Sequence, residues 1–274
     1  MKIKSINLFL LLIPNHGFGQ LLVNSIVEPI QTESKQKYQW CNSSYVGYAW
    51  PMKAGVQNPD VTKFNKVAPG DSDDLKLSNV SYAGISLGRQ VCDWLILSAS
   101  YEIYNSFNYQ NYHQGGYMPT DLINPVDFMR IFTVVHQSIL ANGYFDLPAK
   151  AQKEVGTLIL KPVLGAGLGV AINQMTSFQT LTFVGSPQVA ELSTFGMINF
   201  KNSLAWYLNL GLSFQPKGTS ANFGFGYRYY SGGTFASSSK YVINDADQVG
   251  RVELRPWTGK IKTNQLKLFL DFSF

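Results

Sequence analysis

The sequence predicts an all-β fold, an eight-stranded antiparallel up-and-down transmembrane β-barrel with long surface loops, from three observations. Segments along most of the chain alternate apolar residues with polar or small ones at a period of two, the period of a β-strand. Charged residues make up 14% of the chain and aromatic residues another 14%, a balance unusual for a cytosolic enzyme. The longest apolar run, within residues 6–13, is shorter than the roughly 20 residues of a membrane-spanning helix.

The N-terminus has the order of a secretory signal peptide. Lys2 and Lys4 precede the apolar run, and the small residues Gly17 and Gly19 follow it, which predicts cleavage after residue 19. Export fits the barrel, because a chain bound for the outer membrane must first cross the inner one. Residues 20–43 are polar with little periodicity and are predicted to be a periplasmic tail, so the barrel is assigned to residues 44–274.

The first three strands are predicted from short alternating segments. They lie within residues 45–50, 82–90 and 94–104. In each segment the apolar parity is assigned to the lipid side of the barrel. These outward residues are Val46, Tyr48 and Trp50, then Ala83, Ile85 and Leu87, then Leu95, Leu97, Ala99, Tyr101 and Ile103.

The later strands follow the same logic, with residues 157–172 the clearest case. There the even positions are apolar, whereas Gly165, Gly167 and Gly169 occupy the inner face, where a narrow barrel needs small residues. The fourth strand, within residues 128–147, is the least regular. Residues 206–214, 223–229 and 266–274 bring the total to eight, an even number as in bacterial single-chain barrels. A soluble lipocalin-like barrel would instead turn its apolar parity inward.

The predicted connections alternate between short turns and long loops, as in outer-membrane barrels. The short ones lie around residues 92–93, 148–156 and 215–220, and the others are roughly 20 to 30 residues long. Two long ones contain the aromatic and Asn-rich stretch 107–117 and the segment 231–241, both predicted as surface loops. Surface loops on a rigid scaffold are where binding is usually located, although these aromatic residues also suit an interfacial girdle or a hydrated loop.

Several charged residues fall on the parity that faces the barrel interior. We predict that they form a network of ion pairs and hydrogen bonds that fills the lumen, because isolated charges there would be costly. The alternative is a gated narrow pore. The residues are Glu102, Arg130, His136, Arg228, Lys267 and Asp271.

Enzyme activity is not expected, and a lipid-modifying enzyme is the distant alternative. Such chemistry needs a base beside a nucleophile, and the one candidate is His136 with Ser138 on the same strand face. His16 belongs to the predicted signal peptide, and His113 lies in a predicted loop. No phosphate-binding loop or metal-ligand cluster is present, so no cofactor or metal is expected.

The two cysteines are predicted to lie at the periplasmic rim of neighbouring strands. Cys41 precedes the first strand, and Cys92 falls in the turn between the second and third. The periplasm is oxidising, so the two could form a disulfide if their Cα atoms come within roughly 7 Å.

Several segments, taken in order, resemble the opacity-type bacterial surface antigens and other OmpA transmembrane-like barrels. They are Ser138–Asp146 (SILANGYFD), Lys161–Val170 (KPVLGAGLGV), Gly226–Tyr229 (GYRY) and the closing Leu266–Phe274. The resemblance implies a bacterial outer-membrane location and a variable loop surface. It also implies that the terminal aromatic residue, Phe274, is recognised by the outer-membrane assembly machinery.

The function expected from this reading is that of a monomeric structural surface antigen with adhesion or ligand binding through its loops. The alternatives are the narrow channel and, less favoured, the lipid-modifying enzyme. The expected partners are outer-membrane lipids and lipopolysaccharide, the assembly machinery, and a host or surface ligand. Nucleic acid is not expected, because the net charge of +5 is scattered rather than clustered.

Overall fold

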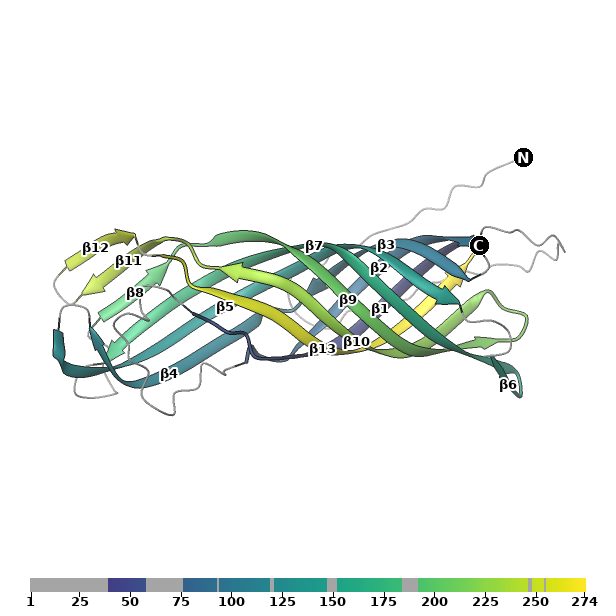
Figure 1. The fold of residues 1–274 in the computed structure, drawn as a ribbon, viewed down its shortest axis with the longest axis horizontal. Coiled ribbons are helices and arrows are strands. Elements are labelled where there is room, and N and C mark those ends of the chain that lie inside the picture. The colour runs from purple at the N-terminus through teal and green to yellow at the C-terminus, as the bar shows by residue number, and fades with distance from the viewer. Residues whose placement is uncertain are drawn as a thin grey trace. The chain divides into compact units, whose positions relative to one another are not determined.

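The computed structural model describes residues 39–57, 76–92, 94–118, 121–146, 152–183, 192–245, 248–253 and 255–274. The predicted signal peptide, residues 1–19, and nearly all of the predicted tail lie outside these residues. Within them every regular element is a β-strand (Figure 1). No helix among the described residues has the length and hydropathy to cross a membrane.

Eight antiparallel strands close into a barrel. Each pairs with the next around the ring, and the last strand pairs with the first. The fold is therefore the predicted eight-stranded up-and-down barrel. In ring order the strands are β1 (Trp40–Pro51), β2 (Val80–Cys92), β3 (Leu95–Tyr104), β5 (Asp121–Asp146), β7 (Leu158–Phe183), β9 (Asn199–Pro216), β10 (Ala221–Ala236) and β13 (Thr258–Ser273).

Several strands continue far beyond the closed ring. β5 and β7 each have 26 residues, whereas about 10 residues of a tilted strand suffice to cross a bilayer. At one end of the barrel, on the left in Figure 1, these strands join further strands in the order β12-β11-β8-β7-β5-β4. We call this part the upper sheet. Its additional strands are β4 (Phe107–Met118), β8 (Leu192–Gly196), β11 (Lys240–Asp245) and β12 (Gln248–Glu253). At the opposite end, the short β6 (Lys153–Val155) pairs with the start of β7.

The upper sheet corrects the prediction that residues 107–117 and 231–241 are loops. The first stretch is nearly all of β4, and the second runs from the end of β10 into β11. The reason is an inverted pattern: Phe107 and Tyr109 point inward, while Asn108 and Gln110 are exposed. A search for strands with an apolar outer face does not recognise such a segment as a strand.

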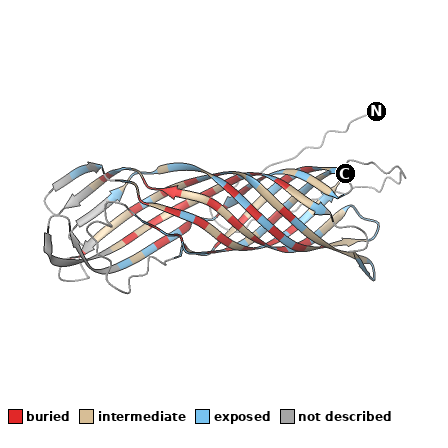
Figure 2. Ribbon diagram, in the orientation of Figure 1, coloured by how far each residue is buried: buried red, intermediate tan, exposed pale blue. Residues whose placement is uncertain are grey.

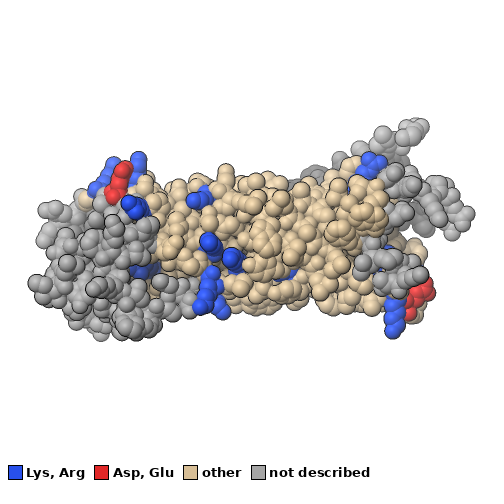
Figure 3. Space-filling model, in the orientation of Figure 1, with Lys and Arg blue, Asp and Glu red and all other residues tan. Residues whose placement is uncertain are grey.

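The outer face of the closed barrel is apolar. Buried and exposed residues alternate along each strand (Figure 2), and the exposed parity is the one that the sequence assigned to lipid. Large residues with about half of their surface exposed line every strand of the ring, among them Val46, Ile85, Leu97, Ile139, Leu168, Leu208, Phe225 and Leu268. On the face shown in Figure 3, a broad part of the closed barrel has almost no charged side chains. We call the apolar outer face of the closed barrel the apolar band.

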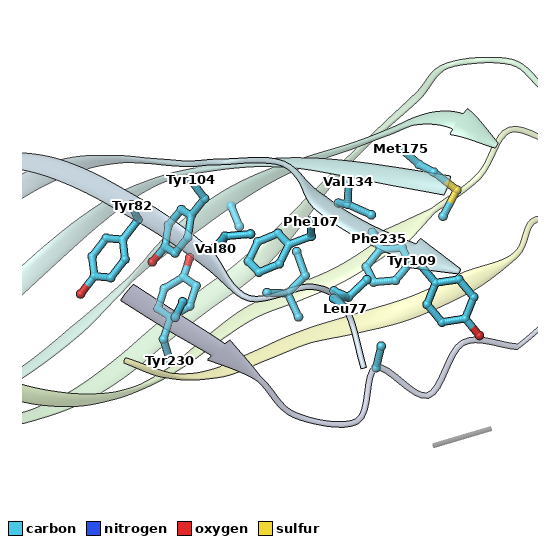
Figure 4. Close-up of a cluster of buried hydrophobic side chains, with 14 of the residues drawn as sticks. Leu77, Val80, Tyr82, Tyr104, Phe107, Tyr109, Val134, Met175, Tyr230 and Phe235 are labelled. Atoms are coloured by element: carbon cyan, nitrogen blue, oxygen red, sulfur yellow. The ribbon is translucent and has the colours of Figure 1, made fainter. Parts of the chain in front are cut away.

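The upper part of the structure has the opposite polarity. Its interior is a core of buried apolar and aromatic side chains (Figure 4), and its exposed positions are largely polar. The exceptions among the described residues are Tyr112, Phe195, Met197, Ile198 and Phe200, which are 40–62% exposed. The core includes Leu77, Val80, Phe107, Tyr109, Phe132, Val134, Met175, Phe178, Phe235, Tyr241, Trp257 and Ile261.

Candidate functional site

An ion pair crosses the lumen of the barrel at mid-height. Glu102 on β3 accepts hydrogen bonds from Arg228 on β10, from Nη1 to Oε1 at 2.5 Å and from Nη2 to Oε2 at 2.6 Å. β3 and β10 lie four strands apart in the ring of eight, so the pair joins opposite walls. Both side chains are essentially inaccessible to solvent, 0% exposed for Glu102 and 1% for Arg228. The bidentate geometry acts as a strut across the barrel.

Hydroxyl groups complete the coordination of the buried carboxylate. Tyr45 donates to Oε1 of Glu102 at 2.7 Å, while Tyr104 and Ser138 donate to Oε2 at 3.0 and 3.4 Å. The guanidinium of Arg228 lies over aromatic rings, with its Cζ 4.1 Å from the ring centre of Tyr207. A buried ion pair tolerates desolvation only when such additional contacts support it, and both partners have them, although Nε of Arg228 has no hydrogen-bond partner among the described residues.

His136 lies next to this pair and is also completely buried. The amide nitrogen of Asn173 donates to the carbonyls of Gly232 and Thr234 at 2.9 and 2.8 Å, so its oxygen is the acceptor for Nδ1–H of His136 at 2.5 Å. Nε2 therefore accepts the hydroxyl proton of Tyr230 at 2.8 Å. For a neutral ring these contacts select the Nδ1–H tautomer, and they link β5, β7 and β10.

The two members of the suggested catalytic pair belong to one cluster, in which both contact the hydroxyl of Tyr230. Ser138 donates to Glu102, whereas both ring nitrogens of His136 are engaged by Asn173 and Tyr230. No hydrogen bond joins Ser138 to His136 among the contacts of the described residues. Both side chains are buried in the same polar cluster of the lumen.

The remaining predicted lumen charges lie above and below the strut. Lys267 is buried, with its Nζ 3.9 Å from the ring centre of Tyr45 and 3.4 Å from the hydroxyl of Tyr144. Asp271, partly buried, is four residues closer to the C-terminal end of β13 on the same face. Arg130 instead belongs to the upper core, where its Cζ lies 4.5 Å from the ring of Trp257. The structure thus brings Glu102 and Arg228 into direct contact and separates Arg130 from them.

Aromatic side chains close the lumen above the strut. Tyr104 stacks on Tyr82 at 5.0 Å, on Tyr230 at 5.6 Å and on Phe107 at 6.1 Å between ring centres (Figure 4). The stack leads into the upper core, so polar packing passes continuously into apolar packing along the barrel interior. These tyrosines were not singled out from the sequence, although they lie on the same inward parity as Glu102 and Arg228.

The predicted disulfide does not form, and Cys41 and Cys92 are free thiols. The strand register gives the reason. Cys41 lies opposite Gly88 in the β1–β2 pair, while Cys92 is four residues further along β2 and pairs with Leu95 after a bulge. Four residues of strand span about 13 Å, well beyond the roughly 7 Å that a disulfide allows between Cα atoms.

Comparison with known proteins finds similarity to solved structures only. No protein-family profile matches the chain, and no curated protein matches it significantly. Neisserial surface protein A is 15% identical, over 86% of this chain and 97% of that chain, with a TM-score of 0.39. The outer membrane protein AlkL is 11% identical, over 91% and 96%, with a TM-score of 0.36. The attachment invasion locus protein Ail of Yersinia pestis is 12% identical, over 87% and 99%, with a TM-score of 0.30. At these scores the assignment of the fold depends on the strand pairing of this chain itself.

Proposed function

We propose that this protein is a closed outer-membrane barrel that holds a rigid β-structured platform above the membrane surface for contact with a ligand or another surface. The observation that carries the proposal is the change of polarity along the strands. The closed barrel is apolar outside and polar inside, as lipid requires, whereas the upper sheet has an apolar interior and largely polar exposed positions, as water requires. Because outer-membrane barrels have short turns on the periplasmic side and long extensions outside, the upper sheet is assigned to the extracellular side.

The filled lumen favours this proposal over a channel. Glu102 and Arg228 bridge opposite walls, and the stack of Tyr82, Tyr104 and Tyr230 lies directly beside them. An eight-stranded barrel has an interior just wide enough for side chains, so these groups leave little room for a water-filled path. Display of the upper sheet is then the function that the architecture supports best.

The proposed partners follow from this orientation. The apolar band would contact outer-membrane lipid, and Phe274, which is 67% exposed at the opposite end, is available to the assembly machinery. Adhesion or ligand binding is assigned to the strands and turns of the upper sheet. We infer a monomer, because the ring of strands is closed within one chain.

The test is refolding of residues 20–274 in detergent, followed by gel migration with and without boiling and by planar-bilayer conductance on the same sample. Heat-modifiable migration without conductance is expected. Discrete conductance would replace display with a channel, and migration unaffected by heat would refute the barrel. A second variant, in which a short turn replaces residues 240–253, should keep heat-modifiable migration and lose binding to cells that the intact protein binds. Unchanged binding would remove this hairpin from the proposed contact surface.

A further inference from the structure

Lysines lie immediately above the apolar band on β13. Along the outward parity of this strand, the exposed Leu270, Leu268 and Leu266 are followed by Asn264 and then by Lys262 and Lys260. The alternation of the strand places both lysines on the lipid-facing side, Lys262 two and Lys260 three outward positions beyond the last leucine, Leu266. Their stems can lie along the apolar surface while the ammonium groups reach the level of lipid headgroups.

Two further lysines join them from neighbouring segments. Met52 donates from its backbone nitrogen to the carbonyl of Lys262 at 2.7 Å, and Lys260 donates to the carbonyl of Ala54 at 2.8 Å, which places Lys53 beside both. Lys53 in turn forms an isolated antiparallel bridge with Lys76. We call Lys53, Lys76, Lys260 and Lys262 the lysine patch. Figure 3 shows Lys and Arg side chains gathered next to the uncharged band.

The acidic side chains that the structure describes lie elsewhere. Glu102 and Asp271 face the lumen, Glu154 is at the opposite end of the barrel, and Glu253 is on β12 in the upper sheet. Among the described residues, no ion pair involves Lys76, Lys260 or Lys262. The like charges of Lys76, Lys260 and Lys262 on adjacent backbone segments repel one another, and an anion bound between them would relieve that repulsion.

We propose that the lysine patch binds the phosphate groups of lipopolysaccharide in the outer leaflet, with the acyl chains packed on the apolar band below. The inference depends on the proposed outer-membrane orientation and extends it with a specific lipid site. Charge complementarity selects a phosphate, and direct continuity with the apolar band selects a phosphate attached to acyl chains rather than a free one. The site lies on one side of the barrel, along β13 and the segment after β1.

The test compares two double variants of the refolded protein. Lys260→Gln with Lys262→Gln removes two charges from the patch, and Lys153→Gln with Lys217→Gln removes two exposed charges at the opposite end of the barrel as the control. Binding of bisphosphorylated lipid A, dephosphorylated lipid A and inorganic phosphate is measured in the same detergent at physiological ionic strength. The patch variant should bind bisphosphorylated lipid A about thirtyfold more weakly, and the control should change little.

Each other result overturns the proposal in a distinct way. Equal loss in both variants would indicate a general charge effect, and unchanged binding in the patch variant would remove these lysines from the site. Equal binding of phosphorylated and dephosphorylated lipid A would exclude phosphate recognition. Competition by inorganic phosphate at the concentration at which lipid A binds would identify a free-phosphate site instead. Heat-modifiable migration of every variant, measured in parallel, separates failure of this site from failure of the barrel itself.

Discussion

Removal of either partner of the strut, Glu102 or Arg228, should destabilise the protein strongly, because both partners are buried. Replacing Glu102 with Gln leaves the guanidinium of Arg228, 1% exposed, without its counter-charge and weakens the acceptor of three hydroxyl groups. Breaking a buried pair from one side typically costs about 3–5 kcal/mol. We expect Glu102→Gln and Arg228→Gln each to lower the free energy of unfolding by this amount, and the double variant to lose clearly less than their sum.

A second ion pair, with nearly the same N···O distance, lies in water and serves as a control. Glu154 and Lys217 form an ion pair of 2.6 Å whose side chains are 68% and 45% exposed. Its removal should cost at most about 1 kcal/mol, because solvent screens such pairs. The measurement is urea unfolding in lipid vesicles, followed by tryptophan fluorescence and by the gel shift of the folded form. Losses at the strut no larger than those at the control, or strictly additive losses in the double variant, would refute the reasoning.

Three further predictions address packing, assembly and membrane contact. Gly169→Ala should block refolding, since its new methyl group would collide with the backbone of β5. Gly143→Ala should refold normally, because its Cβ would meet nothing closer than 3.8 Å. The refolding yield of the two variants is compared on gels. Phe274→Ser should reduce assembly in cells, measured as outer-membrane yield, and leave refolding in detergent nearly unchanged, because its side chain is 67% exposed. Leu208→Lys should lower stability in vesicles by about 2–4 kcal/mol, whereas Val155→Lys, at a site of equal exposure in the β6 turn, should be neutral in the same urea titration.

The barrel was predictable because its outward parity is apolar in every strand of the ring. In β9, for instance, the structure turns one set of alternating residues outward and the other inward. The outward set is Leu204, Trp206, Leu208 and Leu210, and the inward set is Ala205, Tyr207 and Asn209. This signal is local and depends only on the period of a strand. It fails above the apolar band, where Phe107 and Tyr109 face a water-shielded core and the outer residues are polar. The extension of the strands was missed for that reason.

Which residues face the lumen was predictable from the sequence, but which of them contact each other was not. Parity places Glu102, Arg228 and His136 inside, yet their partners depend on which strands face each other across the ring. Glu102 and Arg228 are 126 residues apart in sequence, and the contact of His136 with Asn173 requires the register between β5 and β7. The same limit explains the disulfide prediction, because a four-residue offset in register separates two cysteines that lie at the same rim.

The polar interior of the closed barrel and the apolar core of the upper sheet stabilise the structure in different ways. In the closed barrel the outer face is held in lipid, so the inner face is free to be polar, and cross-lumen bonds such as that between Glu102 and Arg228 fix opposite walls. Above the band, no lipid stabilises the outer face, so the extension needs an apolar core of its own, which Phe132, Phe178 and Trp257 provide. Because β5 and β7 run without a break through both halves, the strut and the upper core stabilise the same two strands. This construction supports the proposed function, the display of a fixed surface to a partner.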